Sequence, residues 1–430
     1  MKPIAKLETA FGSSMWIFAV VLLALICFLP QEIYEMHSGV LFSPPLLWIA
    51  CLGARQRSLK FLWEGTHRGL WLALGALGLS CTAALDRNTA WTAYVSVALP
   101  FAGYYFLGYF LWKEGFDRAR IFIGIWVAFA ALIALIGVVE WLVGSNLIYE
   151  RWVGSSYYER YVSLATFPRP LSTQSHPPIL ASFLLGCLPF ALWFYETVKK
   201  PCRPLALLAI SLMVTGILLA GSRGGFLSAC VAVLVYLWHR NRRAFWITLG
   251  VVLLMPFVLY TEGPPVGFYR FGTRHLIHGG YDSVVSPYRM LRLILVGRVL
   301  LFSPVLGLGL THLRLRFFEF FPSSMPVTHE FMIADNMYLT VLAETGLVGF
   351  IFFYGFVFRL VWRAYRRIRS KEPLEDRGLG LAAWAALLGL LVNMGGYDLL
   401  YWHNPWMLLA ILCGMLRAFV PARVSIDATH

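Results

Sequence analysis

The sequence predicts an all-α, polytopic membrane protein, a fold class that rests on three observations. Of its 430 residues, 59% are hydrophobic and only 13% are charged, whereas soluble domains carry about 25% charged residues. Apolar stretches of about 20 residues fill nearly the whole length, and each is long enough to cross a bilayer as a helix. Lys and Arg concentrate in alternate turns between these stretches. We therefore expect a single integral membrane domain over residues 1–430.

About twelve transmembrane helices are predicted, each from an apolar run that ends at a polar turn. The first run follows Lys2 and Lys6 and has no cleavage site after it, so we interpret it as an uncleaved span rather than a signal peptide. The predicted spans are 13–30, 39–54, 69–85, 90–112, 121–143, 178–198, 204–220, 224–238, 244–260, 336–358, 379–395 and 404–418.

The positions of Lys and Arg predict that both termini are cytoplasmic. With this orientation the inside segments hold 24 of the 36 Lys and Arg residues, and the outside segments hold 12. All seven lysines fall inside, and every outside cation is an arginine. Because a guanidinium binds phosphate with two parallel hydrogen bonds, this outer face fits a diphosphate site. Weaker selection against Arg in long loops is the alternative explanation.

Two long periplasmic loops are predicted, at residues 144–177 and 261–335. Loops of this length are uncommon in compact domains and usually carry function. The second loop contains a run at residues 289–302 that predicts an amphipathic helix at the membrane surface. Arg289 and Arg292 share one face of this interfacial helix.

The junction between the second loop and the following span is the first candidate for a catalytic site. Asp335 and Asn336 end a polar run, and an apolar helix pattern begins directly after them. We place Asp335 at the N-cap, where it would act as a general base that accepts a proton from an acceptor hydroxyl. A capping role alone is the alternative. His329 in the loop and Glu344 inside the span are the other candidate bases.

Gly346 and Gly349 fall on the same helical face as Asp335 at 100° per residue. Residues 336–358 are predicted to form one continuous helix, and we expect these glycines to let another helix pack closely.

Two further segments place an arginine at the outer end of a span. Arg223 lies in a GSRGG turn, where the glycines would let a phosphate approach the backbone. The alternative is that Arg223 only reaches lipid headgroups. Arg169 lies in a proline-rich stretch that leads into the sixth span. Residues 172–174 and His176 follow it, and their neutral side chains would suit sugar hydroxyls, unless this stretch only guides the chain into the helix.

Several other classes of chemistry find little support in the sequence. His275 and His278 form a loose pair with Asp282 as the one nearby carboxylate, so we predict no metal site. The chain has no Walker loop, Rossmann fingerprint or G-x-S-x-G motif, so we predict no cofactor. The net charge of +14 fits anionic lipid and phosphate better than nucleic acid, because the charges lie between spans. Polar residues gather on one outer side, which disfavours a transporter.

Residues 165–350 resemble the O-antigen ligase and polysaccharide polymerase superfamily of bacterial inner-membrane glycosyltransferases. GSRGGF is similar to its Ser-Arg-Gly-Gly turn, and FPRPLSTQSHPPILASFLLGCLPF is similar to its Arg-containing loop. SPYRMLRLILVGRVLLFSPVLGLGL is similar to the segment that contains its Pro-x-x-Gly-x-Gly bend. DNMYLTVLAETGLVGF resembles its His-Asn-x9-Gly-x-x-Gly stretch, with Asn336, Gly346 and Gly349 in register. Ligases place a histidine where this chain has Asp335, so the Asp-Asn pair looks more like the polymerase and exopolysaccharide branch.

The resemblance implies a metal-independent, inverting transfer at the periplasmic face of the bacterial inner membrane. The donor is a glycan on undecaprenyl diphosphate, and the acceptor is a hydroxyl of a glycan or of lipid A-core. We expect a polymerase of O-antigen, capsule or exopolysaccharide. A ligase to lipid A-core or protein is the first alternative, and a transporter of lipid-linked glycan is the second. Membrane lipids and polysaccharide assembly proteins are further expected partners. The residues assigned to the diphosphate or the glycan are Arg169, Arg223, Arg289, Arg292, Asn336 and His176.

Overall fold

The structure is a computed structural model of the chain, and its described part is built from helices. It describes residues 2–30, 38–56, 60–65, 67–113, 115–146, 148, 169–258, 287–321, 334–370 and 377–420. Within these ranges there are helices and no strand, which confirms the all-α prediction.

A helix occupies each of the twelve stretches predicted to span the membrane. The helices that cover these stretches are α1 (Lys2–Phe28), α3 (Ser38–Arg55), α4 (Arg68–Ser80), α5 (Arg87–Lys113), α6 (Phe116–Val143), α9 (Pro177–Thr197), α10 (Arg203–Leu219), α11 (Arg223–Arg240), α12 (Arg242–Val258), α17 (Met337–Ile368), α18 (Arg377–Met394) and α19 (His403–Phe419). The second long loop contributes α14 (Pro287–Phe302), α15 (His312–Leu315) and α16 (Phe317–Phe320).

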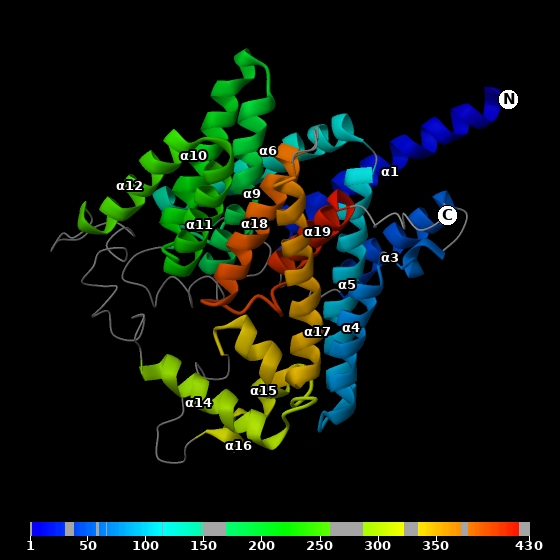
Figure 1. Ribbon diagram of the computed structural model, residues 1–430, viewed down its shortest axis with the longest axis vertical. Coiled ribbons are helices and arrows are strands. Elements are labelled where there is room, and N and C mark those ends of the chain that lie inside the picture. The colour runs from blue at the N-terminus through cyan, green and yellow to red at the C-terminus, as the bar shows by residue number, and fades with distance from the viewer. Residues whose placement is uncertain are drawn as a thin grey trace.

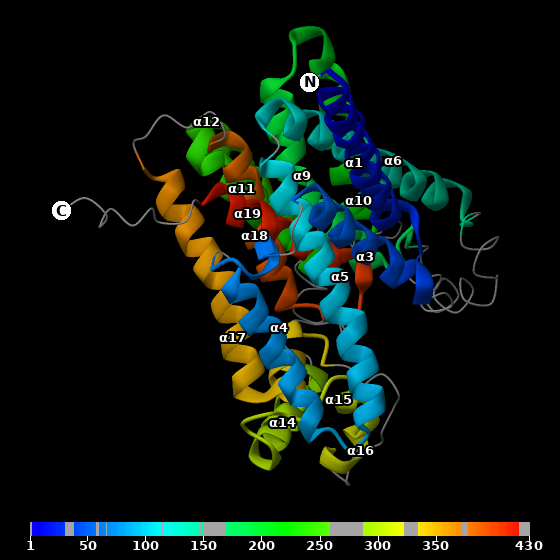
Figure 2. The same cartoon turned by 90° about the vertical axis from the view of Figure 1, so that its right-hand side faces the viewer.

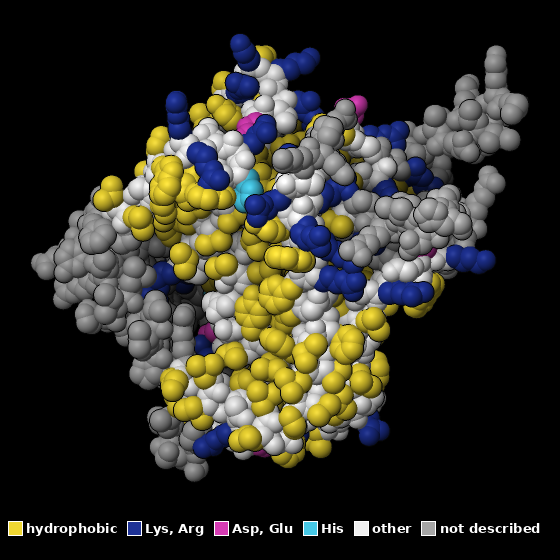
Figure 3. All heavy atoms as spheres, viewed as in Figure 1, with side chains coloured by type: hydrophobic (Ala, Val, Ile, Leu, Met, Phe, Trp, Pro, Cys, Tyr) yellow, Lys and Arg dark blue, Asp and Glu magenta, His cyan; other side chains and the backbone are white. Residues whose placement is uncertain are grey.

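Six of the described helices are long and apolar enough to cross a membrane. They are α5, α6, α9, α17, α18 and the helical stretch Lys200–Leu219 that contains α10. Lys and Arg gather toward the top of the face seen in Figure 3, and a broad apolar band lies below them. A count of twelve spans, the cytoplasmic termini and the division into two periplasmic loops remain predictions.

Close approach between backbones builds the centre of the bundle. The largest helix–helix contact joins α5 to α19, and α9 packs against α10, α11 and α18. A Cβ atom on Gly108 would lie 2.1 Å from the carbonyl oxygen of Ile411, and one on Gly414 would lie 1.9 Å from that of Tyr105. Because neither glycine has a side chain, α5 and α19 meet at main-chain distance, as small residues allow between membrane helices.

A small second core lies at one end of the bundle, where α14, α15 and α16 pack beside α17 (Figure 1). Leu295, Val296 and Val299 of α14 pack with Leu313 and with Phe317. Ala334 and Ala343 of the α17 region belong to the same cluster. The predicted helix within residues 289–302 is therefore present, and its buried apolar residues pack against protein beside α17.

Candidate functional site

Helix α17 is a hairpin of two arms, so the prediction of one continuous helix over residues 336–358 is wrong. Gly346 has φ 62° and ψ −168°, which breaks the helix. The rings of Tyr338 and Tyr354 lie 4.7 Å apart. In a straight helix they would be about 24 Å apart at 1.5 Å per residue. The first arm therefore folds back beside the second, as Figure 1 shows at the lower end of α17.

The glycine-rich bend after α14 closes the tip of this hairpin. The amides of Leu308 and Gly309 donate to the carbonyls of Ala343 and Glu344 at the end of the first arm, at 3.0 and 2.8 Å. A second pair of bonds joins the bend to the start of the second arm, with Leu347 N donating to Pro304 O and Val348 N to Val305 O. The bend thus satisfies backbone groups that the break leaves without helical partners.

Two glycines make this contact possible. A Cβ on Gly346 would lie 2.3 Å from the carbonyl oxygen of Val305, and a Cβ on Gly307 would lie 2.5 Å from the carbonyl carbon of Glu344. Both residues also have positive φ, which glycine adopts at little cost. The expectation that Gly346 lets another helix pack is therefore wrong, because a loop packs there instead.

Asp335 forms an ion pair with Arg292 of α14, with Nη1 2.5 Å from Oδ2. The Arg292 side chain is only 7% exposed, whereas that of Asp335 is 39% exposed. Asp335 is therefore a carboxylate that is fixed from one side and reachable from the other.

Asn336, and not Asp335, is the N-cap of α17, which corrects the placement predicted from the sequence. Its Oδ1 accepts from Tyr338 N at 3.0 Å and from Leu339 N at 3.2 Å. Its Nδ2 donates to the carbonyl of Gly395 at 2.9 Å. With the capping role filled, Asp335 adopts a left-handed backbone (φ 46°) and directs its carboxylate to Arg292. A capping role alone no longer explains Asp335.

The GSRGG turn lies against the same segment that binds Asn336. Arg223 is the first residue of α11, and Ser222 caps this helix by accepting from Gly225 N at 3.1 Å. A Cβ on Gly224 would lie 3.9 Å from the Cα of Gly396, in ordinary contact. Gly395 and Gly396 follow α18, so this short segment links the α11 N-terminus to the start of α17. The structure brings Arg223 and Asn336 to one end of the bundle.

Arg169, which lies in the first long loop, binds the same GSRGG turn. Its Nε donates to Ala220 O at 2.9 Å, and its Nη2 donates to Gly221 O at 3.3 Å. These carbonyls come directly before Ser222, where α11 has its N-cap. Arg169 and Arg223 are therefore neighbours that share one turn.

Residues 172–174 are buried and do not face solvent, so the expectation that they bind sugar hydroxyls is wrong. Ser172 Oγ donates to Ile133 O at 2.7 Å, and Thr173 Oγ1 donates to Cys27 O at 2.7 Å. Their side chains instead anchor the loop to α1 and α6.

Glu140 of α6, which was not among the predicted site residues, binds this same loop. Its carboxylate accepts from the backbone amides of Leu171 and Ser172 at distances between 2.6 and 3.1 Å. Glu140 itself is 4% exposed. An acid inside the most hydrophobic predicted span was a signal that could have revealed it.

His176 lies at the start of α9, with its ring stacked on Tyr397 at 5.9 Å and near Trp402 at 6.0 Å. Burial, and secondarily the charge of Arg169, lowers the pKa of His176 to about 3. The imidazole is therefore neutral at physiological pH. His176 belongs to the same end of the bundle as Arg169, as an aromatic packing partner of the segment between α18 and α19.

Asp398, in the segment between α18 and α19, is a second acid that was not among the predicted site residues. Its Oδ2 accepts from Thr340 Oγ1 at 2.6 Å, and its Oδ1 accepts from Leu400 N at 3.0 Å. Burial, together with the nearby charge of Asp335, raises its pKa to about 6. The signal was an acid in GGYDLLYWHN, a turn between two apolar runs. Asp398 ties the first arm of α17 to the turn that also holds Asn336.

Glu344 lies near the tip of the hairpin and is 1% exposed. The hydroxyl of Tyr401 donates to its carboxylate and accepts from Thr311 N at 2.7 Å. Glu344 therefore connects the hairpin, the bend and the segment before α19, away from solvent.

Two of the predicted site residues cannot be placed. His329 lies outside the described residues, as does the side chain of Arg289 within α14. Within the described ranges, no group of three or more His, Cys, Asp or Glu residues could hold a metal ion.

One comparison with known proteins bears on this site. Residues 206–354 match the family model described as O-antigen ligase. This range contains Arg223, Arg292, Asp335 and Asn336, and it ends before Asp398. The match supports the resemblance of the chain to the O-antigen ligase and polysaccharide polymerase superfamily. A search of curated proteins found no match.

Proposed function

From this O-antigen ligase segment we propose that the protein is a membrane glycosyltransferase that takes a glycan from a lipid diphosphate and transfers it to an acceptor hydroxyl. The observation that carries the proposal is the ion pair between buried Arg292 and half-exposed Asp335. It lies at the same end of the bundle as Arg169 and Arg223, next to the capped start of α17. A carboxylate and several guanidinium groups are the two components that this transfer needs.

Asp335 is the proposed general base. It must lie within hydrogen-bond reach of the acceptor hydroxyl, and its exposed side gives that access. The ion pair with Arg292 fixes the orientation of this carboxylate. Glu344 is fully enclosed and bonded to Tyr401, so its geometry favours a structural role over that of a base. His329 is the remaining candidate.

The arginines at the α11 turn are the proposed donor site. Arg223 sits at a helix N-terminus, where the backbone amides and the helix dipole also favour an anion. Arg169 fixes the turn through the carbonyls of Ala220 and Gly221 and adds positive charge beside it. We assign contact with the diphosphate to Arg223 first. Arg169, Arg289 and Asn336 are further proposed contacts.

In the proposed reaction, the acceptor oxygen attacks the anomeric carbon while the bond from this carbon to the diphosphate oxygen breaks. The acceptor proton passes to Asp335, and the electron pair of the broken bond leaves with the diphosphate. Negative charge therefore develops on the leaving group, where preorganised guanidinium groups stabilise it most. Attack opposite the leaving group inverts the anomeric configuration.

A polymerase is the favoured version of this function, because the chain has Asp335 where ligases place a histidine. In that case the acceptor is a second lipid-linked glycan, at the periplasmic face of a bacterial inner membrane and in company with polysaccharide assembly proteins. A ligase to lipid A-core or protein uses the same chemistry on another acceptor.

A transfer assay with purified protein in lipid tests the function. The donor is an undecaprenyl-diphosphate-linked repeat unit, supplied first alone and then with lipid A-core. A ladder of longer lipid-linked glycans with donor alone supports the polymerase, and product only after lipid A-core is added supports the ligase. If neither condition consumes donor while the lipid-linked glycan crosses vesicle membranes, the protein is a transporter and the proposal fails.

A further inference from the structure

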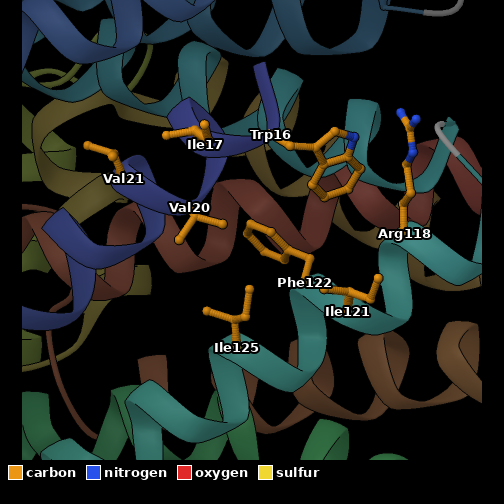
Figure 4. A pocket seen from close by; sticks show the side chains of 8 residues that line it. All are labelled: Trp16, Ile17, Val20, Val21, Arg118, Ile121, Phe122 and Ile125. Atoms are coloured by element: carbon orange, nitrogen blue, oxygen red, sulfur yellow. The ribbon is translucent and has the colours of Figure 1, made fainter. Parts of the chain in front are cut away.

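A groove lies between α1 and α6, and none of its lining residues belongs to the candidate site (Figure 4). Its volume is about 540 Å³, within the range of about 300–1,000 Å³ that is common for ligand sites. Trp16, Ile17 and Val21 line it from α1, and Ile121 and Phe122 line it from α6. The two helices pack side by side, as Figure 2 also shows.

The walls of the groove are apolar and partly open. Ile17 is 67% exposed and Ile121 is 65% exposed, whereas Phe122 at the base is buried. α6 is one of the helices apolar enough to cross a membrane. Ile121 lies on this helix, so we expect its exposed side chain to face lipid chains rather than water, because water contact with apolar surface is unfavourable. A hydrocarbon chain fits the body of the groove.

One end of the groove is cationic. Arg118 lines it from the first turn of α6, and its guanidinium lies over the ring of Trp16, 5.9 Å from the centroid. α6 begins at Phe116, and the Gly115 N-cap provides no side-chain acceptor for its first amides. Helix N-termini attract anions through such amides and through the helix dipole. Asp117 is the one acid in this turn, and it is exposed.

A second guanidinium lies close to the same end. Arg55 lies over the ring of Phe110 at 5.1 Å, and this ring is 6.0 Å from that of Trp16. Lys113 ends α5 just before α6 begins. Basic clusters next to membrane helices attract anionic lipid headgroups.

We propose that the groove between α1 and α6 binds one anionic phospholipid, with an acyl chain along Ile17 and Ile121 and the phosphate at Arg118. The apolar body selects a lipid chain, and the cationic end selects an anionic headgroup over a neutral one. This lipid is distinct from donor and acceptor, because the groove shares no residue with the candidate site. It stabilises the packing of the N-terminal helix against the bundle.

Native mass spectrometry of the full-length protein tests this proposal. The detergent-solubilised protein is titrated with phosphatidylglycerol and, separately, with phosphatidylethanolamine of the same chains. We expect Arg118→Ala to weaken binding of the first phosphatidylglycerol by about tenfold, the size of one charge-assisted contact, and to weaken binding of phosphatidylethanolamine less, because its ammonium offsets the charge of its phosphate. Ile121→Trp fills the groove and should weaken binding of both lipids.

Arg242→Ala is the matched control. Arg242 also stacks on an indole, 3.4 Å from the Trp238 centroid, but it does not line the groove. The Arg242→Ala substitution removes one positive charge, as Arg118→Ala does, but it should leave phosphatidylglycerol binding unchanged. Equal losses for Arg118→Ala and Arg242→Ala would reduce the effect to net charge and overturn the proposal.

A phosphatidylglycerol with a photoreactive acyl end gives a second readout that does not depend on substitution. Crosslinks should map to residues 16–21 or 118–125. Crosslinks that avoid both segments overturn the proposal even if a variant fails to fold.

Discussion

The ring of Tyr338 lies 4.7 Å from the ring of Tyr354, on the opposite arm of α17. This contact shows that the site begins on a short arm that returns beside the longer arm of α17. Tyr338 also donates from its hydroxyl to Leu391 O at 2.7 Å, which fixes the short arm to α18. Asp335 therefore lies at the start of the short arm, which contacts with the longer arm and with α18 hold in place.

Gly346→Ala should destabilise the protein strongly. The added Cβ would lie 2.3 Å from Val305 O, and an L-residue at φ 62° is strained. The two effects together should cost about 2–4 kcal/mol. Thermal unfolding in detergent should show a clearly lower midpoint. Gly355→Ala in the second arm is the control, because a Cβ there meets nothing within 4 Å. Equal midpoints for the two variants would argue against a loop packed at the break.

Asp335→Asn should reduce transfer by about 10²–10⁴-fold without unfolding the protein, since an amide cannot accept the proton. Single-turnover transfer from the lipid-linked donor is the measurement. Glu319→Gln is the matched control. Glu319 also pairs with an arginine, Arg316 at 2.5 Å, but it does not belong to the candidate site, so its loss should leave transfer unchanged. Transfer by Asp335→Asn near the level of the parent protein would exclude Asp335 as the base.

His176 should make the protein less stable in acid. Its folded pKa is about 3 and its ordinary value is 6.5, so between these values the unfolded chain binds the proton and the folded protein does not. The stability that the neutral ring provides is complete above pH 6.5. It is lost as pH falls, by up to about 1.4 kcal/mol per pH unit.

This prediction is checked by comparing unfolding midpoints at pH 8 and pH 5. His176→Phe keeps a ring against Tyr397 but removes the titrating group, so its midpoint should fall less in acid than that of the parent protein. His239→Phe, which changes an exposed imidazole, is the control. If the parent protein and His176→Phe show the same acid shift, His176 does not carry this effect.

Glu140→Ala should cost about 3 kcal/mol, because it leaves the buried amides of Leu171 and Ser172 without their acceptor. The lower unfolding midpoint should be accompanied by faster proteolysis at the loop that contains Arg169. Glu140→Gln should recover part of the loss, since its amide oxygen can accept one of these bonds. Glu319→Ala, at an exposed ion pair, should cost below about 1 kcal/mol. A Glu140→Ala variant as stable as Glu319→Ala would contradict this assignment.

The helices were predictable because each apolar run is long and ends at a polar turn. The hairpin in α17 was not predictable in this way, because the apolar pattern continues across Gly346 while the chain reverses direction there. A glycine inside a helix pattern is compatible with close packing and with a break. Only the bend from Pro304 to Gly309, far away in the sequence, decides between them.

The candidate site was predictable in composition and less so in the roles of its residues. The structure places Arg169, the N-terminus of α11 with Arg223, and Asn336 at one end of the bundle. The N-cap was misplaced by one residue, because Asp and Asn are about equally good caps and only the backbone separates them. Residues 172–174 have polar side chains that are buried in the fold, and the sequence does not show this burial or which backbone amides the acid Glu140 binds.

The bend that closes the tip of the α17 hairpin limits which mutations this site tolerates. α14 and the short arm both lead away from the bend between Pro304 and Gly309, and the bond between Arg292 and Asp335 joins them farther along. The three together form a closed triangle, whose sides are two helices and an ion pair. A single-residue insertion in either helix would turn its far end by about 100° and separate the pair. Substitutions on the outer faces of these helices should therefore be tolerated, whereas changes in their length should abolish transfer.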